Sequence, residues 1–300
     1  MRFSVWPNVG NPYPRVAAVA HHAASTGWDG VWVADHFMPN AADVSGPVLE
    51  CWSVLAALAA TVPRVRLGSL VSGNTYRHPA VLAKVASATD CISGGRVVLG
   101  LGAGWQENEH RAYGIAFHTV AERLAMLDEA CEVITGLLRA DRTTFDGRSY
   151  QLADAPLEPK PANPALPLLI GGGGEKVTLR IAARWADEWN VWGTPDVLRH
   201  KGEVLERHCT DVGRDPASIA HSAQALLYLS TDEAWLAQKR SAPVGTATLI
   251  GTPAQVVEQV AAYRDAGVDE LIVPDWTLGG QARALDTLDL FAAEVATHFR

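Results

Sequence analysis

The sequence predicts a closed (β/α)8 TIM barrel, in which each of eight parallel strands is followed by a helix and insertions follow some strands. Eight short apolar runs alternate with helical patterns along the 300 residues. Several runs lack polar–apolar alternation, which is typical of strands covered on both faces. The alternation also fits an open doubly wound sheet, but the roughly even spacing favours the barrel. The predicted strands are Phe3–Trp6, Gly30–Ala34, Val65–Leu70, Val97–Leu101, Pro167–Ile170, Glu188–Val191, Ser222–Leu229 and Glu270–Val273.

Helix signals occupy the gaps between these runs. Ala121–Ala140 carries apolar residues at spacings of three and four, which gives one apolar stripe. Thr252-Pro253-Ala254-Gln255 is typical of a capping box with proline at the first helical position. His78-Pro79 predicts the start of another helix, and Val177–Trp185 follows a run of four glycines with helical spacing. These segments are expected to form the outer layer of the barrel.

Two stretches depart from the plain repeat. Asp141–Pro167 contains Asp146-Gly147 between β-like runs, which predicts a hairpin, and it ends in a proline-rich segment. Thr231–Gly251 is a second insertion. Insertions after barrel strands usually shape the active site. No linker or charge run demands a boundary, so we expect one domain over residues 1–300.

Composition excludes several classes of protein. The net charge of −8 and the lack of Lys/Arg clusters argue against a nucleic-acid partner. The first residues lack the apolar core of a signal peptide, and no apolar run is long enough to span a membrane, so we expect a cytoplasmic protein. No CxxC or HExxH occurs, so we expect no metal. We expect the four cysteines to be small buried residues in a reducing compartment; they are Cys51, Cys91, Cys131 and Cys209.

The four glycines Gly171–Gly174 lie between a predicted strand and a predicted helix. Backbone N–H groups at such a junction bind phosphate, since no Cβ atom blocks its approach. Lys176 would add positive charge, whereas Glu175 argues against an anion. A tight turn would need only one glycine, so the run favours a phosphate site. The glycines of 100–104 have GxGxG spacing, which does not match the dinucleotide fingerprint.

Polar and aromatic residues follow other predicted strands. His36 is the best candidate for proton transfer, with Asp35 beside it, although both would equally serve to cap the loop. Trp105, Trp192 and Trp276 fall at strand ends, where they would line an apolar pocket or pack in the core. In a barrel, these strand ends form the active site.

Taken together, these segments resemble the luciferase-like monooxygenase superfamily, in particular its deazaflavin-dependent actinobacterial branch. Each matching string is moderate evidence, and their order from about residue 1 to 275 is strong evidence. The strings are Trp32–Phe37, Arg77–Lys84, Ser93–Trp105, Leu169–Lys176, Ala186–Asn190, Gly213–Pro216 and Gly251–Pro253.

The resemblance implies a barrel whose flavin or deazaflavin ring lies at the strand carboxyl ends, with its phosphate on the four-glycine loop. It also implies a non-proline cis peptide bond around Ser69-Leu70-Val71 behind the ring. The residues expected to contact the cofactor are Asp35, Ser69, Leu70, Val71, Ser72, Asn74, Gly104, Trp105, Asn108, Gly171, Gly172, Gly173, Gly174, Glu175 and Trp192.

The implied activity is hydride transfer between coenzyme F420 and a small organic substrate, with His36 as the proton-transfer residue and Asp35 beside it. Arg77, Lys160 or Arg180 would meet the polyglutamate tail of F420. An FMN-dependent monooxygenase fed by a partner reductase is the main alternative, and a catalytically silent flavin-binding barrel is another. The resemblance also implies a homodimer. The substrate and the direction of hydride transfer do not follow from the sequence.

Overall fold

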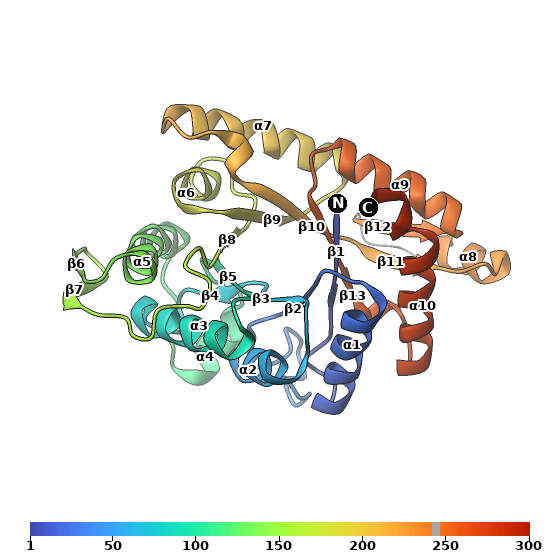
Figure 1. Ribbon diagram of the computed structural model, residues 1–300, viewed down its shortest axis with the longest axis horizontal. Coiled ribbons are helices and arrows are strands. Elements are labelled where there is room, and N and C mark those ends of the chain that lie inside the picture. Colours follow the sequence, from blue (N-terminus) through green and yellow to red (C-terminus); the bar gives the residue numbers. More distant parts are fainter. Residues whose placement is uncertain (242–246) are drawn as a thin grey trace.

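The computed structural model describes residues 1–241 and 247–300, and eight of the described strands close into a parallel barrel surrounded by helices (Figure 1). Counted along the chain, the first of these eight strands pairs with the second and with the eighth. The third pairs with the fourth, so the ring of strands is continuous. The predicted fold class is therefore confirmed. The barrel strands are β1 (Arg2–Trp6), β2 (Gly30–Val33), β3 (Arg66–Ser69), β5 (Val97–Gly102), β8 (Leu168–Gly171), β9 (Glu188–Trp192), β10 (Ala220–Gln224) and β13 (Glu270–Pro274).

The predicted strand Ser222–Leu229 is two strands in the structure. β10 ends at Gln224, and β11 (Leu226–Leu229) leaves the barrel to pair with β12 (Thr248–Gly251) outside it (Figure 1). The prediction of one continuous strand was wrong, because no glycine or proline within this segment marks the change of pairing partner after Gln224. Part of the predicted insertion Thr231–Gly251 lies at 242–246, outside the described residues.

The helices begin and end at the expected signals. The predicted helix Ala121–Ala140 is Val120–Arg139, and Thr119 and Glu122 form its capping box. Gln255 Oε1 accepts a hydrogen bond from Thr252 N at 3.0 Å, as a capping box requires. The helices are α1 (Tyr13–Thr26), α2 (Cys51–Thr61), α3 (Pro79–Ser93), α4 (Glu107–Tyr113), α5 (Val120–Arg139), α6 (Thr178–Trp185), α7 (Pro195–Asp211), α8 (Glu233–Arg240), α9 (Pro253–Asp265) and α10 (Gln281–Glu294).

Shorter elements complete the fold. The predicted hairpin around Asp146-Gly147 is confirmed as β6 (Thr143–Asp146) and β7 (Gln151–Ala155), which pair antiparallel. A two-residue strand, β4 (Ser72–Gly73), extends the sheet beside β5. The 3-10 helices are Pro216–Ser218, Asp275–Thr277 and Ala296–Phe299.

A polar cluster fills the amino-terminal end of the barrel. Glu270 is fully buried and accepts hydrogen bonds from Ser4 Oγ at 2.6 Å and Trp32 Nε1 at 2.8 Å. Arg66 bridges the carboxylates of Glu270 and Glu188, so the buried charges are compensated. This cluster closes the lower end of the barrel and leaves the carboxyl ends of the strands for the ligand site.

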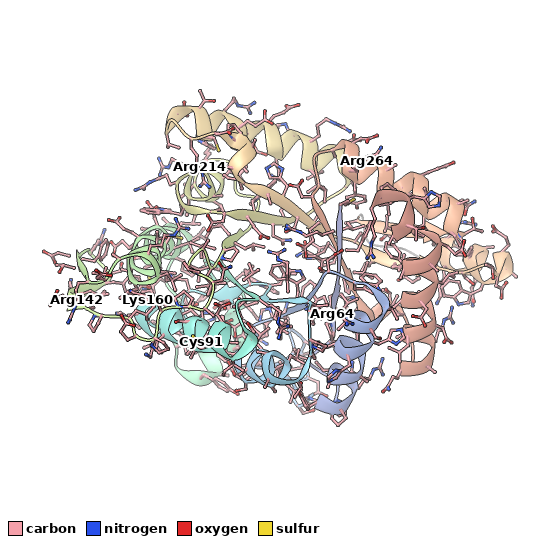
Figure 2. All side chains as sticks on the ribbon, in the orientation of Figure 1. Arg64, Cys91, Arg142, Lys160, Arg214 and Arg264 are labelled. Carbon is pink, nitrogen blue, oxygen red and sulfur yellow. The ribbon has the colours of Figure 1, made fainter. Side chains whose placement is uncertain are left out.

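One cysteine prediction was wrong. Cys51, Cys131 and Cys209 are buried, but Cys91 is exposed on α3, where its thiol donates to Lys160 O at 3.3 Å (Figure 2). The position is one of the outward-facing residues of an amphipathic helix, and this exposure depends on how α3 packs. Among the described residues, no helix is long and apolar enough to cross a bilayer.

Candidate active site

A cavity of about 660 Å³ opens at the carboxyl ends of the barrel strands. This volume lies within the range of small-molecule sites, and the wall is mostly apolar. Five of the predicted site residues do not line it; they are Ser69, Asn74, Asn108, Gly173 and Glu175. The predicted residues that do line it are Asp35, His36, Leu70, Val71, Ser72, Gly104, Trp105, Gly171, Gly172, Gly174 and Trp192.

A bulge after β3 forms one wall of the cavity. The peptide bond between Leu70 and Val71 is cis, which confirms the implied geometry. The neighbouring strands carry glycine where they face this bulge. A Cβ atom on Gly102 would lie 2.7 Å from Val71 Cγ2, and one on Gly171 would lie 2.8 Å from both Val71 methyl carbons. The GxGxG spacing thus has a packing function, which the sequence did not indicate.

Ser69 supports the bulge from behind. Its Oγ donates to Gly100 O at 2.9 Å and accepts from Gly100 N at 3.1 Å. Ser72 Oγ donates to Ser69 Oγ at 3.0 Å and accepts from Trp52 Nε1 at 3.0 Å. Ser69 itself does not line the cavity, but its hydrogen bonds hold in place the residues that do.

The four-glycine loop, whose first residue packs against Val71, leads into α6. Gly172 has a φ of +127°, a conformation open essentially only to glycine. No described side chain caps the amino terminus of α6, and in its first turn Leu179 N donates to Gly174 O of the loop at 3.0 Å. Thr178, at the first position of α6, also lines the cavity. These features fit a phosphate group, which helix amino termini bind through backbone N–H groups.

Lys201 lies against the outer side of this loop and was not predicted. Its Nζ donates to Gly173 O at 2.7 Å and pairs with Glu175 Oε1 at 3.2 Å. Glu175 also lies 3.3 Å from His200 Nε2, and it is exposed. Glu175 therefore faces α7 rather than the cavity. Its negative charge no longer argues against an anion site at the glycine loop.

Asp35 is held by an arginine from the loop before α3. Arg77 donates to Asp35 Oδ2 at 2.6 Å and Oδ1 at 3.0 Å, and also to Glu50 Oε1 at 2.6 Å. Burial raises the pKa of Asp35, and the Arg77 guanidinium opposes that rise. Because Arg77 is engaged by two carboxylates, it is not free to meet a polyglutamate tail. Lys160 donates to carbonyls at the end of α5, including Leu137 O at 2.9 Å, so it is engaged as well.

His36 is oriented by a buried glutamate from α4. Glu109 Oε1 lies 2.8 Å from His36 Nδ1, and Glu109 Oε2 accepts from Phe37 N at 2.7 Å. Tyr76 donates its hydroxyl to the same carboxylate. Burial of Glu109 disfavours its charge, but the hydrogen bonds from His36, Phe37 and Tyr76 outweigh burial and lower its pKa.

This contact fixes the tautomer of the imidazole. Nδ1 must carry the proton that it shares with a carboxylate, so Nε2 of the neutral ring is left as an acceptor. The indole of Trp105 packs against the ring with centroids 5.5 Å apart and an interplanar angle of 81°. Glu109 follows β5 by seven residues and belongs to a strand-end segment, but only the fold shows that it meets His36.

The two predicted asparagines hold loops around the cavity. Asn74 Nδ2 donates to Tyr150 OH at 3.2 Å, and Asn108 Nδ2 donates to Pro39 O at 3.0 Å. Asn108 Oδ1 also accepts from Glu109 N at 2.9 Å. Asn108 thus helps to place the glutamate that orients His36.

Tryptophans form part of the rim. Trp105 and Trp192 are 61% and 40% exposed although they line the cavity, and Trp276 is 44% exposed. Trp6, which was not predicted, lies 4.9 Å from Trp276 and 6.2 Å from Trp192 between ring centroids. Exposed indoles beside a cavity offer flat apolar surface to a ligand.

The strands and the cavity define a (β/α)8-barrel enzyme with a candidate ligand site at the strand carboxyl ends. The family model described as Luciferase-like monooxygenase matches residues 1–244. The chain belongs to this family.

Relatives and solved structures agree with that assignment. The chain is 38% identical over 175 residues to an F420-dependent glucose-6-phosphate dehydrogenase of Kineococcus radiotolerans, a match that covers 58% of this chain and 50% of the relative. The chain thus spans about half the length of the first curated relatives it matches.

Two solved structures share the fold at low identity. An F420-dependent secondary alcohol dehydrogenase in complex with an F420–acetone adduct superposes with a TM-score of 0.85 at 20% identity, covering 98% of each chain. The oxygenating constituent of 3,6-diketocamphane monooxygenase of Pseudomonas putida, in complex with FMN, has a TM-score of 0.76 at 18% identity, covering 99% of this chain and 98% of the other.

Proposed function

We propose that this protein is an F420-dependent oxidoreductase that transfers a hydride between the deazaflavin and a small organic substrate. The observation that carries the proposal is that one cavity joins the four-glycine loop, the Leu70–Val71 bulge and the His36–Glu109 pair. F420-dependent dehydrogenases among the relatives and structural neighbours support the choice of cofactor.

The residues present fit such a cofactor. Backbone N–H groups of the glycine loop and of the start of α6 would hold a phosphate, and the bulge with Leu70 and Val71 would support a flat ring. Bound there, the deazaflavin would supply or accept the hydride. The chain itself would position the substrate and keep water away.

His36 is the residue that we assign to proton transfer. Glu109 holds Nδ1, which leaves Nε2 to take a proton from an alcohol or to return one to the product oxygen. The negative charge of Glu109 stabilises the imidazolium that forms when Nε2 is protonated. Asp35 is bound to Arg77 and Gly73 N, so we assign it to shaping the pocket beside His36 rather than to proton transfer.

We do not assign to this chain the substrate of the dehydrogenase from Kineococcus radiotolerans. Among the described residues that line it, Arg123 is the one Lys or Arg. Its Nε donates to Gly104 O at 3.2 Å, and its guanidinium stacks over Phe117 at 4.0 Å from the ring centroid. With no free cation for a phosphorylated sugar, the mostly apolar wall favours an uncharged organic substrate.

Titration of the purified protein with F420 and, separately, with FMN tests the cofactor, since quenching of Trp105 and Trp192 reports binding. We expect micromolar binding of F420 and weaker binding of FMN. The opposite preference would make the protein an FMN-dependent monooxygenase that needs a partner reductase. Binding without turnover of any hydride acceptor or donor would instead indicate a silent flavin-binding barrel.

His36→Ala tests the catalytic role. We expect cofactor binding within threefold of wild type and a loss of turnover of about 100-fold or more. His22→Ala is the matched control, because His22 pairs with Asp289 at 2.7 Å on the outer helices. Turnover of His36→Ala within a few fold of wild type would refute the assignment.

The proposal includes a single domain over residues 1–300. It is supported by the pairing of the first strand with the last strand of the barrel and by the bond from the Met1 amino group to Phe299 O at 3.1 Å. It also includes the homodimer expected of the family, which sedimentation equilibrium would test.

A further inference from the structure

Three side chains on β9 and β10 form a chain of hydrogen bonds within the barrel. Gln224 Nε2 donates to Asn190 Oδ1 at 2.7 Å, and Asn190 Nδ2 donates to Ser222 Oγ at 2.9 Å. Ser222 Oγ donates in turn to Trp189 O at 3.3 Å. All three side chains are at least 97% buried, and Asn190 and Gln224 line the cavity.

The direction of this chain is fixed at its inner end. A backbone carbonyl only accepts hydrogen bonds, so Ser222 must donate to Trp189 O and accept from Asn190. Asn190 then presents its oxygen to Gln224, and Gln224 must use its NH2 group there. The remaining Gln224 atom, Oε1, is therefore held as an acceptor and cannot exchange places with the nitrogen without breaking the chain.

Gln224 Oε1 is buried without a hydrogen-bond partner among the described residues, and Gln224 is one of the residues that line the cavity. An unpaired buried acceptor is costly, so its persistence beside a cavity points to a donor on the bound ligand. Asn190 belongs to the strand next to the glycine loop, since Gly172 N donates to Asn190 O at 2.9 Å. The free acceptor and the loop assigned to phosphate thus lie on neighbouring strands.

We propose that Gln224 Oε1 accepts a hydrogen bond from the ring imide N–H of the bound cofactor, with Asn190 and Ser222 fixing its orientation. This inference rests on the proposed function. The imide N–H is common to deazaflavin and flavin rings, so Gln224 recognises the ring in either case and does not select between F420 and FMN. Ser222 is a positioning residue that acts through Asn190.

Comparison of FMN with 3-methyl-FMN, which lacks the imide N–H, tests the contact on the purified protein. We expect wild type to bind FMN about tenfold more tightly than 3-methyl-FMN, the effect of one hydrogen bond to a buried acceptor. In Gln224→Leu, the two ligands are expected to bind equally, and F420 is expected to bind about tenfold more weakly than to wild type. Gln238→Leu, on the exposed face of α8, is the matched control and should keep the wild-type preference.

Ser222→Ala provides a second variant should Gln224→Leu fail to fold. Ser222 does not line the cavity, and its loss lets both carboxamides rotate together while keeping their mutual hydrogen bond. We expect its preference for FMN over 3-methyl-FMN to fall by about threefold, with Tm near that of wild type.

The outcomes separate this inference from the proposed function. If wild type binds FMN and 3-methyl-FMN equally, or if Gln224→Leu keeps the preference, the ring contact is refuted while the proposed function stands. If Gln224→Leu raises the KM for the substrate and leaves the cofactor Kd unchanged, the ring contact is also refuted, because the hydrogen-bond donor would then belong to the substrate. Wild type that binds neither cofactor refutes the proposed function and the ring contact with it.

Discussion

Glu109→Gln is the substitution that most directly tests how the site is built. The glutamate is fully buried and accepts from three donors, His36 Nδ1, Phe37 N and the Tyr76 hydroxyl. Glutamine has nearly the same shape but offers one oxygen and one NH2 group. If the NH2 group takes the Oε2 position, it faces Phe37 N–H, which only donates; if it takes the Oε1 position, it can donate to His36 Nδ1 only after the imidazole changes tautomer. In either orientation at least one of the present hydrogen bonds is lost.

The expected magnitude follows from these contacts. A hydrogen bond to a charged group contributes about 1.5–3 kcal/mol, and an unpaired buried donor costs about 1–3 kcal/mol. We expect the free energy of unfolding to fall by about 3 kcal/mol, which at roughly 2 °C per kcal/mol lowers Tm by about 6 °C. Turnover should fall about 100-fold, because His36 loses both its fixed tautomer and the charge that stabilises the imidazolium.

Differential scanning fluorimetry, cofactor titration and a pH profile of kcat measure these effects separately. Glu107→Gln is the matched control, since Glu107 lies on the same helix, is exposed and pairs with Arg111 at 2.6 Å. It should change Tm by less than about 1 °C. Turnover of Glu109→Gln within threefold of wild type, with an unchanged pH profile and intact cofactor binding, would show that Glu109 does not position the base.

Three further predictions concern the loop, the buried ion pair and acid stability. Gly172→Ala should weaken cofactor binding about tenfold, because φ is +127° at this position and backbone strain of this kind costs about 1–3 kcal/mol. Gly213→Ala is the control for a positive-φ glycine, since Gly213 has φ +69° and lies outside the cavity. Equal losses of binding in both variants would refute a specific effect of the loop. Arg77→Leu should lower the free energy of unfolding in urea by about 3–5 kcal/mol, because it leaves the Asp35 carboxylate buried without its partner. Adding Asp35→Asn should restore more than half of that loss. If the effects of the two substitutions are strictly additive, the two residues are not coupled. Because folding lowers the pKa of Glu109 from its usual 4.5, the stabilising contribution of this carboxylate is present above that pH and is lost as pH falls through the lowered value. The difference in unfolding free energy between wild type and Glu109→Gln should therefore shrink as pH falls below 4.5; a difference independent of pH would contradict the charge of Glu109.

The barrel was predictable because its signals are local. Apolar runs, helix caps at Thr119 and Thr252, and the turn at Asp146-Gly147 depend on neighbours a few residues away, so each can be recognised in isolation. The strand break after Gln224 could not be recognised in this way, since no glycine or proline marks the point where the chain leaves the barrel and β11 pairs with β12.

The sequence by itself determined the kind of site: a glycine loop before a helix, a histidine after the second strand and tryptophans at strand ends. Only the tertiary structure decided which side chains meet. His36 and Glu109 are 73 residues apart, and Gln224 and Asn190 are 34 apart, so no spacing rule connects them. Parallel strands bring their carboxyl ends to one face, and the closing of the barrel turns residues distant in sequence into hydrogen-bonded partners.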